Sequence, residues 1–232
     1  MPKKRNILEE WDITLQEFTQ LVRENPSLRG PLMGYISEFK LNHIWLSSVE
    51  ISESSKPDDH DRKKKGDRVV TYKGHRFILE AKSLQTNMVK KIGDTFVGKS
   101  QCDASDKRKV VLPNGHEVNT TLLVTGEFDI LAVNIFAFEN KWRFVFAKNE
   151  DLPTSTFRGY EPEDAKYLIA SLIPVTWPSK PPFRDEPFSL MKEIIKERER
   201  AKGKPAKTAI IKEPGERPVA VDTEHPRPAR KL

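Results

Sequence analysis

Apolar side chains recur at helical spacing in the first 45 residues of the chain. Residues 12–25 carry such a set, with Asp12 placed as an N-cap and Asn25-Pro26 as a stop. Residues 32–45 repeat the pattern with charged positions between the apolar ones. The sequence therefore predicts two amphipathic helices here, followed by a polar surface loop over residues 56–68.

The pattern changes to that of strands at Arg68. The segments RVVTY and HRFILEAKS are rich in β-branched and aromatic residues and flank Lys73-Gly74, which predicts a β-hairpin. The same criteria predict strands over 117–124, 128–138 and 142–147, then helices over 162–172 and from 187 onward. Because helices precede and follow a block of strands, the expected fold is α/β, with a central mixed β-sheet flanked by helices.

Composition divides the 232 residues into three parts. Residues 1–30 are expected to form an N-terminal helix packed on the core, and residues 31–196 a single α/β domain. Residues 197–232 hold ten Lys/Arg, six Asp/Glu and five Pro but few large apolar side chains, so they are expected to be a disordered basic tail. Most of the net charge of +6 lies in this tail, which weakens it as evidence for a nucleic-acid partner.

Two features indicate the cellular setting. No apolar run approaches the roughly 18 residues that a membrane span needs, and the first residues lack the apolar centre of a signal peptide. The single cysteine, Cys102, cannot form an internal disulfide. We therefore expect a cytoplasmic protein with no membrane partner.

The hairpin predicts which side chains face each other. If Lys73 and Gly74 are the two turn residues, the cross-strand register places Asp67 opposite Glu80, and the alternation of a strand puts Lys82 on the same face as Glu80. Two facing carboxylates repel, and a divalent cation with oxygen ligands would resolve that repulsion. A three-residue turn with a bulge at Gly74 would instead bring Gly66 opposite Glu80.

One hairpin strand begins beside the acidic residue Asp67, and the next strand ends in Glu80-Ala81-Lys82. This arrangement resembles that of the PD-(D/E)xK nuclease superfamily. The resemblance covers roughly residues 32–148 and implies a restriction-endonuclease-like fold. It implies that Asp67, Glu80 and the carbonyl of Ala81 bind Mg²⁺, with Mn²⁺ as a substitute. It also implies that Lys82 helps to activate the attacking water and stabilises charge on the phosphate.

The resemblance extends to positions outside the hairpin. Glu38 lies on the preceding helix, where many members carry a glutamate that polarises water or binds a second metal, and Gln85 matches a polar residue that follows the lysine in some members. The basic loop is expected to contact nucleic acid through Lys63, Lys64, Lys65 and Arg68. The identity of the first acid stays open, because Asp58, Asp59 and Asp61 lie in the same loop.

Two further sequence signals do not indicate a functional site. Residues 93–100, GDTFVGKS, match a phosphate-loop pattern but lack the buried strand before it and the helix after it, so no nucleotide site is predicted. Asp129 lies in an apolar segment, where a carboxylate needs a partner; structural pairing is favoured over a place in the acidic cluster.

The function expected from the sequence is Mg²⁺-dependent hydrolysis of phosphodiester bonds by an endodeoxyribonuclease of restriction, defence or repair type. Double-stranded DNA is the favoured partner, RNA is left open as a substrate, and a homodimer is compatible with the fold. Two alternatives remain. One is a non-catalytic nucleic-acid-binding module on the same scaffold, and the other is an interaction protein whose tail recruits a partner.

Overall fold

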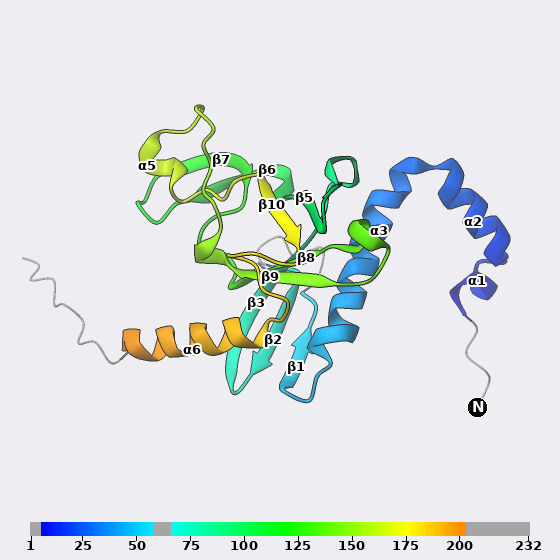
Figure 1. The fold of residues 1–232 in the computed structure, drawn as a ribbon, viewed down its shortest axis with the longest axis horizontal. Helices are drawn as coiled ribbons and strands as arrows, with labels where there is room; N and C mark the ends of the chain where they lie inside the picture. The colour runs from blue at the N-terminus through cyan, green and yellow to red at the C-terminus, as the bar shows by residue number, and fades with distance from the viewer. Residues whose placement is uncertain (1–5, 58–65, 203–232) are drawn as a thin grey trace, which may run out of the picture.

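The computed structural model describes residues 6–57 and 66–202. Its centre is a five-stranded sheet in the order β1-β2-β3-β8-β9 (Figure 1). The strands are β1 (Ile51–Ser55), β2 (Arg68–Tyr72), β3 (His75–Ser83), β8 (Ile130–Asn134) and β9 (Phe144–Lys148). β3 and β8 are parallel, whereas the other neighbours are antiparallel. The predicted mixed sheet flanked by helices is confirmed.

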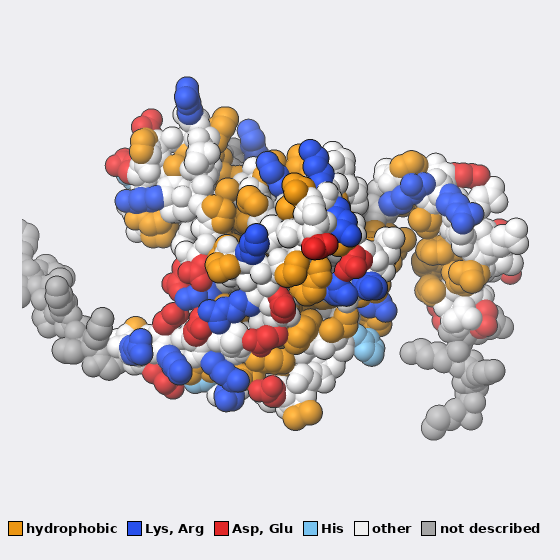
Figure 2. Space-filling view, in the orientation of Figure 1, with side chains coloured by type: hydrophobic (Ala, Val, Ile, Leu, Met, Phe, Trp, Pro, Cys, Tyr) orange, Lys and Arg blue, Asp and Glu red, His pale blue; other side chains and the backbone are white. Residues whose placement is uncertain are grey.

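The N-terminal helices start at different residues from those predicted. They are α1 (Ile7–Glu10), α2 (Leu15–Glu24) and α3 (Pro26–Leu41), and a π-helical turn, Asn42–Leu46, continues α3. The N-cap of α2 is Thr14, not the predicted Asp12, which has a φ of 53°. α2 packs against α3, while α1 and α2 extend beside the body of the molecule (Figure 1). Figure 2 shows orange apolar side chains exposed on this extension, where Leu15 keeps 70% of its surface.

The β2–β3 hairpin has the two-residue turn that the sequence predicts. Lys73 and Gly74 have φ values of 48° and 76°, which are the positive angles of a type I′ turn. The register runs from Tyr72 opposite His75 to Arg68 opposite Leu79. The predicted register is therefore confirmed along the paired strands, and the alternative with a three-residue turn is wrong.

The strand predicted over 128–138 is too long. β8 ends at Asn134, whose side chain accepts a hydrogen bond from the N–H of Phe136 (2.9 Å) at the start of α4 (Phe136–Glu139). Every residue of β8 and β9 is buried. A continuous apolar run does not distinguish a buried strand from the partly buried helix that follows it, so the boundary could not be found from periodicity.

Five strands outside the central sheet form two smaller sheets. β10 (Leu172–Trp177), β5 (Thr95–Gln101) and β4 (Lys90–Ile92) form one, and β6 (Asp103–Val111) pairs with β7 (Glu117–Leu122). The sequence predicted β7 but not the other four. The segment GDTFVGKS continues into β5, and no helix follows it.

The helix predicted over 162–172 is wrong beyond its first turn. α5 (Pro162–Ala165) is short, and Leu168 and Ile169 instead form isolated bridges with Val124 and Thr154. Short 3₁₀ turns lie at Thr86–Met88 and Asn149–Asp151. The last helix in the described part of the chain is α6 (Phe188–Lys202). The rest of the expected tail lies outside the described residues, and no helix among those described is long and apolar enough to cross a membrane.

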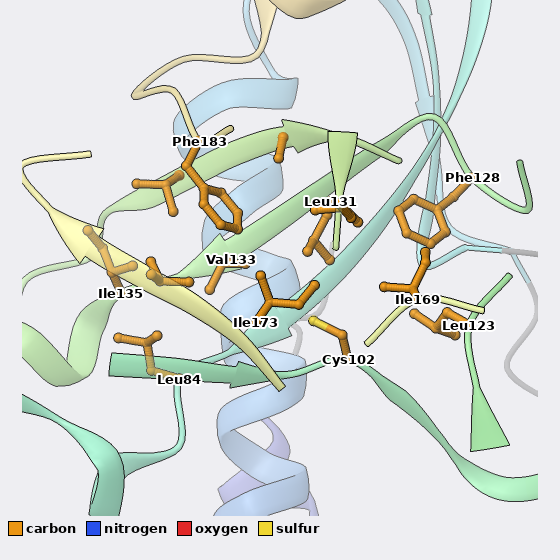
Figure 3. Packing of buried hydrophobic residues seen from close by; sticks show 14 of the residues in the cluster. Leu84, Cys102, Leu123, Phe128, Leu131, Val133, Ile135, Ile169, Ile173 and Phe183 are labelled. Atoms are coloured by element: carbon orange, nitrogen blue, oxygen red, sulfur yellow. The ribbon is translucent and has the colours of Figure 1, made fainter. Parts of the chain in front are cut away.

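The central sheet separates two apolar clusters. One packs β3 and β8 against α3 and α6 through residues such as Leu41, Leu79 and Met191. The other packs the opposite face against the β5–β10 sheet, with Leu131, Val133, Ile173 and Cys102 in contact (Figure 3). Because side chains alternate along β3, Leu79 belongs to the α3 face, whereas Ile78 and its even-numbered neighbours belong to the other.

Candidate active site

Asp67 lies just before β2 and is fixed by the backbone of β3. Its N–H donates to the carbonyl of Leu79 (2.9 Å), and its carboxylate Oδ2 accepts from the N–H of Ala81 (2.7 Å). Gly66 makes this approach possible, because a Cβ at its φ of 74° would lie 2.9 Å from the Leu79 carbonyl and 2.3 Å from Ile78 Cγ2. The close packing of residues 66–67 against β3 thus places the Asp67 carboxylate against the backbone between Glu80 and Lys82.

Glu80 and Lys82 lie on one face of β3 and form an ion pair. The Lys82 Nζ is 2.9 Å from the Glu80 Oε1, and the two side chains keep only 21% and 12% of their surface exposed. A pair so well shielded from water interacts more strongly than one on the surface. Asp67, Glu80 and Lys82, which the sequence predicted to converge, are therefore brought together at the end of the hairpin.

Burial shapes the acid–base properties of all three groups. Burial raises the pKa of Asp67, with the Ala81 N–H and the Lys82 charge acting against it. The pKa of Glu80 is raised by burial and, next, by the charge of Asp67. Burial works to lower the pKa of Lys82, but the opposing effects, mainly from Glu80 and then Asp67, together outweigh it and the net shift is upward. The site therefore holds two carboxylates that disfavour each other's ionisation and one firmly charged amine.

Glu38 reaches the same region from α3. Its carboxylate pairs with the Lys56 Nζ at 2.9 Å, and its charge contributes to the raised pKa of Asp67. Glu38 is 15% exposed, so its carboxylate is also largely shielded from water. The helix before the hairpin thus supplies a third acid, as the resemblance implies.

A cleft of about 820 Å³ opens over this group, between α3 and the end of β3. The cleft is lined by Glu38, Asp67, Ala81, Lys82 and Gln85 but not by Glu80, whose Oε1 is 2.9 Å from the Lys82 Nζ. The Gln85 side chain donates to Gln101 on β5, and its backbone N–H donates to the carbonyl of Lys99 (2.8 Å). One cleft therefore collects five of the residues singled out from the sequence.

The remaining predicted residues are placed differently. Arg68 lies in β2 next to Asp67, is partly buried and does not line the cleft. The other basic residues of the loop, Lys63, Lys64 and Lys65, and the alternative acids Asp58, Asp59 and Asp61 lie outside the described residues. Asp129 pairs with Arg198 at 2.5 Å and accepts from the N–H of Ile78 (2.8 Å), so the favoured structural pairing is what the structure shows.

Two charged neighbours of the site have no signal in the sequence. Arg108 on β6 binds Glu127 through both terminal nitrogens, at 2.6 and 2.5 Å, and also donates to the carbonyl of Leu122 (3.3 Å). The charge of Glu127 adds to the raised pKa of Glu80. The pKa of Arg108 is raised mainly by its hydrogen bonds to Glu127 and, to a smaller extent, by the Glu80 carboxylate. Arg108 on β6 and Glu127, which follows β7, therefore contribute to the electrostatic environment of the acids from far along the chain.

The donor set suits a hard divalent cation. Two neighbouring buried carboxylates with raised pKa values are stabilised by a positive charge between them, and carboxylate and carbonyl oxygens are the ligands that Mg²⁺ takes. Among residues 6–57 and 66–202, no three His, Cys, Asp or Glu side chains gather as a ready-made metal cluster. The metal site implied here has only two ligand side chains, Asp67 and Glu80. Its third ligand is the backbone carbonyl of Ala81, so it is not a group of three such side chains.

Comparisons with known proteins add little to this geometry. No family model matches the chain, and no curated protein matches it. Among solved structures, the chain is similar to a bacterial homing endonuclease, I-Ssp6803I, with a TM-score of 0.37 and 14% identity over 75% of this chain and 98% of that one. At this level of similarity two chains need not share a fold or an activity.

Proposed function

We propose that this chain is a metal-dependent nuclease of the PD-(D/E)xK type that hydrolyses phosphodiester bonds in DNA. The observation that supports this most directly is the meeting of Asp67, Glu80 and Lys82 at one end of the hairpin. A module that only binds nucleic acid has no need of two buried acids, because they repel phosphate. The combination of two acids and an amine suits hydrolysis instead.

Asp67, Glu80 and the carbonyl of Ala81 are the groups that would hold Mg²⁺ or Mn²⁺. When bound, such an ion lowers the pKa of water and stabilises negative charge on phosphate. The backbone bond from Ala81 to Asp67, at 2.7 Å, orients that carboxylate before any ligand arrives. Preorganisation of this kind avoids an entropic cost during the reaction.

Lys82 and Glu38 serve the substrate side of the site. Both line the cleft, so the Lys82 ammonium can donate to a phosphate oxygen or to the attacking water. Its raised pKa keeps it protonated at neutral pH, which suits charge stabilisation rather than proton abstraction. Glu38 is the acid placed to orient water, with Lys56 holding it at 2.9 Å.

Cleavage of supercoiled plasmid DNA tests the proposal. The purified chain is expected to nick or linearise the plasmid with Mg²⁺ or Mn²⁺ and to be inactive in EDTA. Glu80→Ala and Lys82→Ala should lower the rate by at least about a hundredfold, the lower end of the usual effect of losing a catalytic group. Glu163→Ala and Lys166→Ala, exposed positions at α5, are the matched controls and should cut normally.

Folding of each variant is checked by circular dichroism, so that loss of cutting is not loss of structure. If the chain binds duplex DNA with a steep salt dependence but leaves it uncut with either metal, the binding-module alternative replaces the nuclease. Cleavage that survives Glu80→Ala in a folded protein would contradict the proposed site.

A further inference from the structure

One face of α3 forms a smooth wall of the cleft. Gly30 and Gly34 are four residues apart, and both line the cleft. A Cβ built at either position meets nothing within 4 Å, so the space in front of this face is open. Glycine is the least favourable residue for a helix interior after proline, and here it leaves room that any side chain would fill.

Ser37 continues this face toward the acids. It is 2% exposed and lines the cleft, yet its Oγ has no hydrogen-bond partner among the described residues. A helical serine commonly donates to a carbonyl one turn earlier, and a buried hydroxyl without a partner costs free energy. An acceptor in the cleft would supply the missing bond.

The charges at the two ends of this face suit a phosphate backbone. Arg29 lines the cleft next to Gly30, and it is fixed by donating to the carbonyls of Val22 (3.2 Å) and Arg23 at the end of α2. Lys82 lies at the other end, beside Asp67. Between them, the acid of Glu38 is already paired with Lys56.

The dimensions suit a single strand. Seven residues separate Gly30 from Ser37, which is about 10 Å along a helix. A stacked strand covers this distance with about three nucleotides at roughly 3.4 Å each. The cleft volume of about 820 Å³ is within the usual range for a small-molecule pocket of roughly 300–1,000 Å³, so it suits a short stretch of one strand rather than a duplex.

Resting on the nuclease function proposed above, we infer that the α3 face formed by Gly30, Gly34 and Ser37 receives the sugar–phosphate backbone of the DNA strand to be cut. The glycines let the strand approach the helix backbone closely. Ser37 donates its hydroxyl to a phosphate oxygen, and Arg29 and Lys82 attract the phosphates on either side. The strand is thereby guided to Asp67.

Filling the groove tests this inference without disturbing the core. Gly34→Leu enters open space and favours the helix, so the variant should unfold at the same or a higher temperature. Binding of a fluorescein-labelled DNA strand, measured in Ca²⁺ by anisotropy, should weaken at least tenfold. Ser37→Ala should weaken it about threefold. Ser27→Leu places the same side chain at an exposed position of α3 that does not line the cleft, and should bind normally.

Thiol protection gives an independent readout. Cys102 is 1% exposed, so Gly30→Cys introduces an accessible thiol against an unreactive background. Added DNA should slow its alkylation at least fivefold, while a cysteine at the exposed Thr156, in the loop before α5, should react at an unchanged rate.

The outcomes separate this inference from the function on which it rests. If Gly34→Leu is folded and binds and cuts DNA like the unmodified chain, the inference is overturned while the nuclease stands. If the unmodified chain binds DNA but never cuts it, the nuclease proposal fails, and weakened binding by Gly34→Leu still supports the groove. If the unmodified chain does not bind DNA at all, both are overturned.

Discussion

Removing the Lys82 ammonium should destabilise the fold as well as the reaction. Lys82→Met leaves the Glu80 carboxylate without the partner that lies 2.9 Å away, and both side chains are mostly shielded from water. Breaking a buried pair by removing one partner costs roughly 3–5 kcal/mol, because an uncompensated charge remains. At about 2–4 °C per kcal/mol for a domain of this size, the unfolding temperature should fall by about 6–20 °C near pH 7.

The size of this loss should depend on pH. Burial and Asp67 raise the pKa of Glu80, and loss of Lys82 raises it further. The folded variant therefore holds a proton more tightly than the unfolded chain, whose glutamate titrates near 4.5, so its stability falls as the pH rises above that value. The deficit relative to the unmodified chain should be small in acid and largest at neutral pH.

Urea unfolding followed by circular dichroism measures both effects at acidic and neutral pH. Lys99→Met, on an exposed position of β5, is the matched control and should change the free energy of unfolding by no more than about 0.5 kcal/mol. A loss below about 1 kcal/mol for Lys82→Met at neutral pH, or one that does not shrink in acid, would refute the claim that this pair is buried and charged.

Three other predictions follow from the site and its hairpin. Mg²⁺ at a hundred times its dissociation constant should raise the free energy of unfolding by about 2.7 kcal/mol. Asp67→Asn should abolish this gain, whereas the control Asp94→Asn, on the exposed β4–β5 turn, should keep it. Gly74→Val should cost more than about 1 kcal/mol in urea unfolding, because φ is 76° at a position where a β-branched residue is strained; a neutral effect would contradict the turn. Cys102, which is 1% exposed and whose pKa burial raises to about 11, should react with a thiol reagent only after unfolding, and fast reaction of the native protein would contradict its burial.

The sequence by itself determined the hairpin and the relative places of its charged residues. Lys73-Gly74 selects a two-residue turn, and the turn sets the register of every pair back to Arg68 and Leu79. The alternation of side chains then puts Glu80 and Lys82 on one face. These are local consequences of backbone geometry, so no knowledge of the rest of the fold is needed.

Only the tertiary structure decided what surrounds that hairpin. Segments that are distant along the chain meet in three features around it: the pairing of Glu38 with Lys56, the ion pair of Arg108 with Glu127, and the cleft beside α3. Residues 168–172 show the same dependence, because bridges at Leu168 and Ile169 and the start of β10, which pairs with β5, replace the end of the helix that the sequence predicts over 162–172. Long-range pairing of this kind depends on which partner strand has an open edge and a matching apolar face, and neither is a property of the segment itself.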